Sequence, residues 1–229
     1  MDWIRQSGKN LTTIYITHGH GDHFFGLNTI LAAFPDARAV TAVAVVPFAQ
    51  GQVGPEGMGF WSAVFPDQIP EQPIVPQALD GDVIDLEDQE LRIVAVDQAD
   101  TAPSTIVHIP SLDAVIAGDV VYNGIHQWLA ETDHESRTRW LASIEQVEAL
   151  QPRIVVAGHK RPDARDDDPA AIFSATKVYI RDFEQSLAES RSAQELVDKM
   201  TVLHRDRGNP YTLWTAAQAA FAQRQNAAS

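Results

Sequence analysis

Apolar positions along the chain form two kinds of pattern, short β-branched runs and longer stretches with helical spacing. The short runs predict strands at residues 11–17, 37–42, 90–96, 104–109, 114–122 and 153–158. Apolar residues three or four positions apart predict helices at residues 24–34, 140–150, 170–189, 193–205 and 211–223. The chain is therefore expected to be an α/β (α+β) protein, a mixed sheet with helices and a helical tail.

The segment at residues 47–76 interrupts this pattern with six prolines and several aromatic residues set among Gly and Gln. Because proline and glycine break regular elements, we expect a long loop or lid here with one broken helix. Its aromatic side chains either fill the core or border a ligand. The sequence leaves both interpretations open.

Composition narrows the classes of function. The 229 residues are 45% hydrophobic and carry a formal net charge of −14, with 17 Lys and Arg against 31 Asp and Glu. Binding to phosphate backbones or to anionic membranes needs a basic surface, so neither nucleic acid nor membrane is an expected partner. There is no cysteine, no apolar run that could span a bilayer and no secretory signal pattern, so the expected location is the cytoplasm.

The residues with the clearest chemical character form the stretch HGHGDH, residues 18–23. Three imidazoles and one carboxylate follow a predicted strand, and the two intervening glycines let the backbone turn so that these side chains converge. Imidazole with carboxylate suits zinc, iron or manganese. The stretch predicts a metal site made of His18, His20, Asp22 and His23.

This motif resembles that of the metallo-β-lactamase superfamily, in which HxHxDH opens a dinuclear metal site on a four-layer αββα sandwich. AGDVVY resembles the family segment that carries the bridging aspartate, which would be Asp119, and VVAGHK resembles the segment of the last histidine, which would be His159. The resemblance implies a family-like domain at residues 1–165, followed by a C-terminal helical extension at residues 166–229 that packs on it.

Carried over by position, the resemblance implies that His18 and His20 bind a first metal ion. Asp22, His23 and His159 would bind a second, and Asp119 would bridge the two. The expected cofactors are two divalent metal ions, with zinc first and iron or manganese as alternatives.

The chain departs from the family pattern in two places. A family histidine expected before the bridging aspartate is missing from VDQADTAPST, where Asp100 or Gln98 takes its place. Asp100 is the favoured substitute, because a carboxylate is a better metal ligand than an amide oxygen. The family also has N-terminal strands ahead of HxHxDH. Only a short stretch precedes His18 here, so we expect either a truncated chain or a sheet completed by another subunit.

The resemblance implies a metal-dependent hydrolase that uses a metal-held hydroxide on a small ester, lactone, thioester or amide. Asp22, Asp119 and Tyr122 are the expected catalytic residues. Tyr122 is placed like a substrate-binding tyrosine of lactone-hydrolysing members, although a core tyrosine explains it as well. His126 lines the pocket or packs in the core. The alternatives are a non-catalytic metal-binding or assembly protein and a metal-dependent oxidoreductase of the same superfamily. The expected partners are a small-molecule substrate and a second copy in a homodimer.

Overall fold

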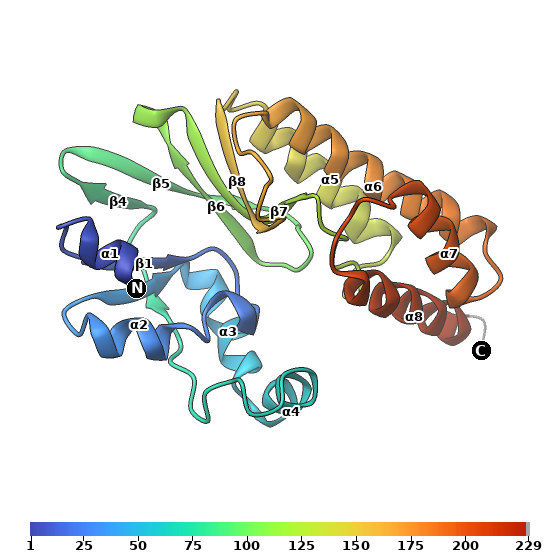
Figure 1. Cartoon of the computed structure of the whole chain (residues 1–229), viewed down its shortest axis with the longest axis horizontal. Coiled ribbons are helices and arrows are strands. Elements are labelled where there is room, and N and C mark those ends of the chain that lie inside the picture. The colour runs from blue at the N-terminus through green and yellow to red at the C-terminus, as the bar shows by residue number, and fades with distance from the viewer. Residues whose placement is uncertain (228–229) are drawn as a thin grey trace. The chain divides into compact units, whose positions relative to one another are not determined.

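The structure, a computed structural model, describes residues 1–227, and the chain divides into two compact units, Met1–Ile84 and Asp85–Ser229. Figure 1 shows both along the colour gradient, with the first unit in blue to teal. Each unit has its own sheet and its own helices. The division after Ile84 lies far from the boundary predicted at residue 165, and it groups the C-terminal helices with the second sheet. How far the family-like domain extends stays a prediction.

The first unit contains a three-stranded sheet in the order β1-β2-β3, in which both strand pairs are parallel. Ile16, Phe24, Leu27 and Trp61 lie in its apolar core. The elements in chain order are α1 (Asp2–Gln6), β1 (Thr13–Ile16), η1 (Gly21–His23), α2 (Leu27–Ala33), β2 (Arg38–Thr41), η2 (Val43–Val45), α3 (Val46–Gln52), α4 (Pro55–Val64) and β3 (Gln77–Ala78).

The proline-rich segment is more regular than the sequence predicts. The expected long loop with one broken helix is wrong for residues 46–64, which form the two helices α3 and α4. Pro47 and Pro55 lie in the first turns of these helices, where the missing proline N–H costs nothing because helix N-termini leave their first N–H groups unbonded. These prolines therefore mark where helices begin.

The second unit holds a five-stranded sheet in the order β4-β5-β6-β7-β8, with β4 crossing the division between the units. Strands β5, β6 and β7 pair antiparallel, and β7 pairs parallel with β8. Strands β5 to β8 confirm the sequence prediction, whereas β3 and β4 were not predicted. The elements are β4 (Val83–Leu86), β5 (Gln89–Val96), β6 (Ser104–Ile109), η3 (Pro110–Leu112), β7 (Ala114–Asn123), α5 (His134–Glu148), β8 (Ile154–Lys160), α6 (Pro169–Glu189), α7 (Ala193–Leu203) and α8 (Pro210–Ala227).

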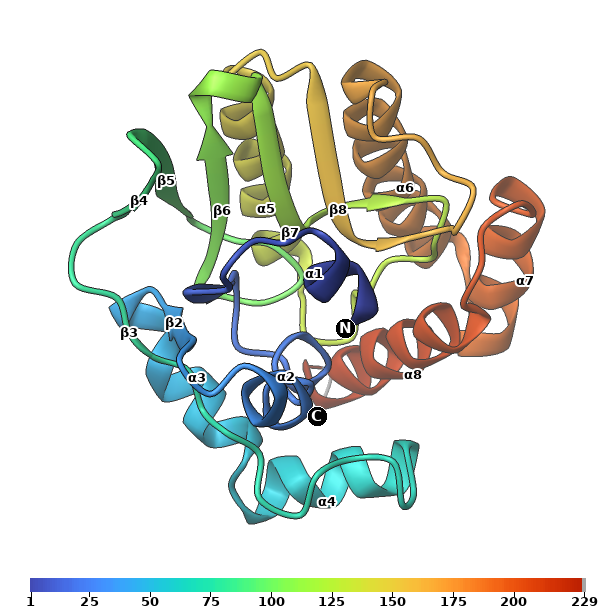
Figure 2. The same cartoon turned by 60° about the vertical axis from the view of Figure 1, so that its left-hand side comes forward.

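Helices α5 and α6 cover one face of this sheet, as both views show (Figures 1 and 2). Trp140 and Ile144 of α5 and Tyr179 and Phe183 of α6 are completely buried in the core with side chains of β7 and β8. Helix α7 packs on α6 and α8. The predicted C-terminal helices are confirmed within a few residues at each end.

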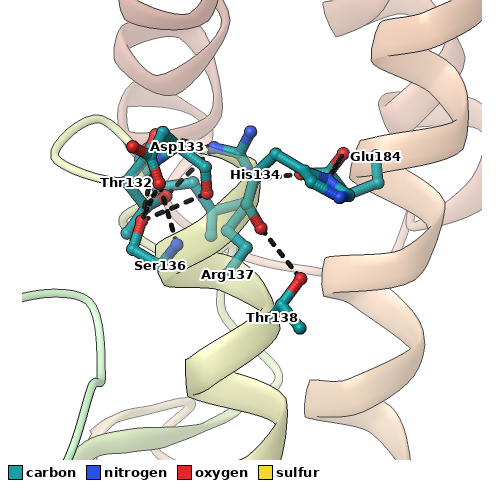
Figure 3. Close-up of polar contacts among 8 residues, drawn as sticks. Thr132, Asp133, His134, Ser136, Arg137, Thr138 and Glu184 are labelled. Atoms are coloured by element: carbon teal, nitrogen blue, oxygen red, sulfur yellow. Dashed lines mark hydrogen bonds and ion pairs between the residues drawn. The ribbon is translucent and has the colours of Figure 1, made fainter.

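A polar network fixes the start of α5 against α6 (Figure 3). Asp133 caps the helix: its carboxylate accepts from the backbone N–H of Ser136 at 2.8 Å, and the Ser136 hydroxyl accepts from the N–H of Asp133 at 2.7 Å. Hydrogen bonds that the Asp133 carboxylate accepts from the N–H and the hydroxyl of Ser136 lower the pKa of Asp133. Buried Arg137 donates to the carbonyl oxygen of Thr132 at 2.7 Å and pairs with Glu184 of α6. Burial alone would raise the pKa of Glu184, but hydrogen bonds from Arg137 and His134 outweigh it and lower the pKa.

Candidate metal centre

In the first unit the candidate ligands follow the carboxyl end of β1. The chain leaves β1 at Ile16 and enters a tight turn in which His23 N–H donates to the carbonyl oxygen of His20 at 3.1 Å. This turn brings the rings together: the centroids of His18 and His23 lie 4.1 Å apart and those of His18 and His20 5.1 Å apart. Nitrogen atoms of each pair lie within 4.8 Å of one another, and so do ligand atoms of Asp22 and His23.

Two neighbouring residues fix the rings. The hydroxyl of Thr17 lies 3.1 Å from Nδ1 of His18, so this ring nitrogen is engaged by the protein. Proteins commonly orient a metal-binding histidine by a hydrogen bond to the ring nitrogen that does not bind the metal. The ring of Phe48, in α3, lies edge-on to His20 with centroids 5.5 Å apart. Sequence reasoning missed both contacts. The aromatics in the proline-rich segment were the only signal that pointed to Phe48.

The glycines of the motif are required by space. A Cβ atom on Gly19 would meet the Phe48 ring at 2.5 Å and the backbone nitrogen of Ala49 at 2.9 Å. One on Gly21 would meet the rings of Phe25 and Trp61 within 2.7 Å. The sequence predicted a need for flexibility at these positions. The structure adds that α3 and α4 pack directly on the loop that carries the histidines.

In the second unit three candidate residues meet around a tyrosine. Tyr122 and Asp119 lie on β7, and the Tyr122 hydroxyl donates to Oδ2 of Asp119 at 2.5 Å. The same hydroxyl lies 3.5 Å from Oδ2 of Asp100. His159, on β8, places Nε2 3.3 Å from Oδ2 of Asp119 and stacks on the Tyr122 ring with centroids 5.4 Å apart. Asp100, Asp119 and Tyr122 are buried.

The side chains of Asp100 and Gln98, the two possible substitutes for the missing family histidine, have different partners in the structure. The side chain of Gln98 is committed elsewhere: its amide nitrogen donates to the carbonyl oxygen of Ala99 at 3.0 Å, and its oxygen accepts from Arg139 at 3.2 Å. Asp100 accepts from the N–H of Thr101 at 2.8 Å and shares the Tyr122 hydroxyl with Asp119. Asp100 is therefore the residue that the fold brings to the other candidates of this unit.

His126 is a packed side chain. Its Nδ1 lies 3.0 Å from the hydroxyl of Tyr179, and the residue is buried. Burial, together with the nearby Arg207 and His204, lowers the pKa of His126 to about 4. Of the two interpretations that the sequence left open, the packing role is the one that fits these contacts.

With both sets of residues described, the chain can be compared with known proteins. The family model for the metallo-beta-lactamase superfamily matches residues 1–159. The chain belongs to this superfamily. No curated protein matches it.

Solved structures of superfamily proteins share its fold. A beta-lactamase domain protein from Burkholderia ambifaria is 18% identical, with a TM-score of 0.60 over 93% of this chain and 67% of the other. A metallo-beta-lactamase family protein from Thermus thermophilus is also 18% identical, with a TM-score of 0.61 over 94% and 75%. A metallo-beta-lactamase from Pontibacter korlensis is 16% identical, with a TM-score of 0.53 over 79% and 74%. The expected superfamily membership and α/β (α+β) fold class are confirmed.

Members of the metallo-β-lactamase superfamily are generally metal-dependent hydrolases that bind divalent metal ions, although some members are not enzymes. The described residues include His and Asp side chains of the kinds that such ions need. Within residues 1–227, no helix is long and apolar enough to cross a membrane.

Proposed function

We propose that this chain is a metal-dependent hydrolase that acts on a small ester, lactone, thioester or amide. The observation that carries the proposal is that metal-ligand side chains gather in two compact sets, one in the turn after β1 and one around strands β7 and β8. One set holds His18, His20, Asp22 and His23, and the other holds Asp100, Asp119 and His159. Each set offers the imidazole and carboxylate donors that divalent metal ions need.

The donor chemistry fits divalent zinc, iron or manganese. The seven residues offer four imidazoles and three carboxylates, and the chain has no thiolate to select a softer metal. When bound, such ions supply a hydroxide near neutral pH and polarise the carbonyl group of a substrate. We place zinc first, with iron and manganese as alternatives.

The protein's own residues supply orientation and proton transfer. The Tyr122 hydroxyl donates to Oδ2 of Asp119 at 2.5 Å. This hydrogen bond orients the carboxylate and so determines which of its oxygens faces a ligand. Asp22 is exposed and lies 3.5 Å from Nε2 of His23, so it can exchange protons with solvent. We assign Asp22 the transfer of a proton to the leaving group, because a carboxylate beside the metal ligands can act as a general acid.

Elemental analysis of the purified chain, followed by assays on a lactone, a thioester and a β-lactam, tests the proposal. We expect one or two equivalents of metal and turnover of at least one substrate, both lost with a chelator. His18→Ala should lose metal, whereas His134→Ala, at a side chain that is 82% exposed, should not. A protein that takes up no metal would contradict the proposal.

A second candidate is a non-catalytic metal-binding protein. The observation that favours it is the family histidine replaced by a carboxylate at Asp100, which departs from the pattern of the active enzymes. Two equivalents of metal with no turnover on the panel would support this candidate over the hydrolase.

A further inference from the structure

Strand β7 is irregular where it carries Asp119 and Tyr122. Its register with β8 shifts between Gly118, which is opposite Ala157, and Tyr122, which is opposite His159. The ladder with β6 has its last pair at Ile116. Gly118 adopts a positive φ of 50°, a left-handed conformation that favours glycine. Asp119 and Tyr122 thus lie on a bulged segment, and bulges commonly redirect side chains beside active sites.

Two completely buried side chains bind the backbone of this bulge. Trp140, on α5, donates from Nε1 to the carbonyl oxygen of Val120 at 2.9 Å. Thr176, on α6, accepts from the N–H of Tyr122 at 3.3 Å, and its hydroxyl lies 3.2 Å from the Tyr122 carbonyl oxygen and 2.8 Å from that of Ile172. The Trp140 ring also lies 6.2 Å from the Tyr122 ring.

These contacts have a physical cause. A buried backbone group outside the regular strand ladder still needs a hydrogen-bond partner, and an unpaired one is costly. At Tyr122 the Thr176 hydroxyl supplies the acceptor that a strand neighbour would have supplied, while its single hydrogen lies nearest the carbonyl oxygen of Ile172. At Val120 the indole N–H of Trp140 donates to the backbone carbonyl oxygen, in place of the N–H of a neighbouring strand. The two helices therefore supply what a continuous ladder would have supplied.

We infer that Thr176 and Trp140 are positioning residues for the metal centre, and this inference rests on the proposed function. They act by holding the bulged backbone. The backbone in turn sets where the Tyr122 hydroxyl meets Asp119 and where its ring stacks on His159. Neither Thr176 nor Trp140 is among the candidate ligands. Supporting residues of this kind often change metal affinity 10- to 100-fold when replaced.

The test uses Thr176→Val, which keeps the shape of the side chain but removes the hydroxyl, and Thr176→Ser, which restores the hydroxyl. The matched control is Thr212→Val. Thr212 is also a buried threonine, and its hydroxyl donates to the carbonyl oxygen of His126 at 2.8 Å, away from the bulge. In the full-length chain we expect Thr176→Val to speed hydrogen exchange of the Tyr122 amide at least about 10-fold. Thr176→Ser should stay near the wild-type rate.

The second measurement is the affinity for zinc and the absorption spectrum of the cobalt-loaded protein. We expect Thr176→Val to weaken zinc binding by about 10-fold or more and to alter the cobalt spectrum. Thr176→Ser and Thr212→Val should leave both unchanged. If Thr176→Val does not fold, Trp140→Phe, which keeps an aromatic ring but lacks the N–H, takes its place with the same expected changes.

The two hypotheses fail differently. Wild-type zinc affinity and cobalt spectrum in both Thr176→Val and Trp140→Phe would overturn the positioning role while leaving the hydrolase proposal intact. A wild-type chain that binds neither zinc nor cobalt would overturn the proposed function, and with it the centre that these residues are inferred to hold.

Discussion

The two units assemble their candidate ligands in different ways. In the first unit, all four residues lie within six positions of the chain, and one tight turn after β1 brings them together. In the second unit, Asp100, Asp119 and His159 come from three separate segments, and a sheet with two covering helices brings them together. The local set is therefore visible as a motif, whereas the distributed set depends on tertiary structure.

The two sets are also held in place by different kinds of contact. The histidine loop of the first unit is held by close packing, with Phe48 against Gly19 and His20. The second set is held by hydrogen bonds, from Trp140 and Thr176 to the backbone and from Tyr122 to Asp119. Added volume should damage the first set most, and loss of a polar group should damage the second.

The largest expected effect is that of Asp119→Ala, which removes the carboxylate at the centre of the distributed set. We expect metal content to fall and kcat/KM on any substrate turned over by the wild-type chain to fall by about 100-fold or more. The control is Asp97→Ala, because Asp97 belongs to the same unit but its side chain is 71% exposed. Unchanged turnover in Asp119→Ala would remove this aspartate from the mechanism.

Added volume tests the local set. Gly19→Ala places a Cβ atom against the Phe48 ring and the Ala49 backbone, and we expect it to lower the free energy of unfolding by about 2 kcal/mol. Gly26→Ala is the matched control, since a Cβ there meets nothing within 4 Å, and it should change stability by less than about 0.5 kcal/mol. Denaturant unfolding of both variants measures the difference. Equal stabilities would show that the loop is not closely packed.

The pH dependence of stability tests the packing of His126 in the second unit. Because the pKa of His126 is about 4 in the folded chain and near 6.5 when unfolded, the unfolded chain takes up a proton first as pH falls. The stability that the neutral ring supports is complete above pH 6.5 and is lost progressively as pH falls toward 4. Unfolding measured between pH 4 and 7 should depend less on pH in His126→Asn. An identical pH dependence would argue against a neutral buried His126.

The smallest expected effect concerns the start of α5, the helix that carries Trp140, a support of the distributed set. Asp133→Ala removes a cap that is bonded to both the N–H and the hydroxyl of Ser136, and it should cost about 1 kcal/mol of stability. Asp168→Ala removes a cap with a single bond, to the N–H of Ala171 at 3.2 Å, and should cost less. Thermal unfolding compares the two, and a larger loss in Asp168→Ala would contradict this order.

The sequence predicted regular elements well where side-chain pattern alone decides them. The strands around Ile93, Ile106 and Val115 and the three C-terminal helices follow from apolar spacing. It failed at residues 46–64, because proline breaks a helix interior but is favourable in the first turn, where Pro47 and Pro55 lie. Short β3 and β4 carry too few residues for a pattern to show.

For the candidate centre, the sequence could name residue types but not their supports. His18, His20 and His23 are close in the chain, so their proximity in space follows from a turn. The choice of Asp100 over Gln98 rested on ligand chemistry, and the fold adds that the Gln98 amide is engaged by Arg139. Thr176 could not have been found, because nothing in its helix marks a threonine that bonds to a strand 54 residues earlier.

The bulge in β7 has a consequence for insertions and deletions. Between the pairs Gly118–Ala157 and Tyr122–His159, the chain advances four residues on β7 but only two on β8. The preceding shift, between the pairs Ile116–Val156 and Gly118–Ala157, adds one more residue on β7. The total surplus from Ile116 to Tyr122 is therefore three residues, an odd number, so the alternation of side chains between the two faces of the sheet is reversed across the irregularity. Deleting three residues from 117–121 would restore a regular strand with Tyr122 still opposite His159, whereas deleting one or two would leave part of the surplus in place.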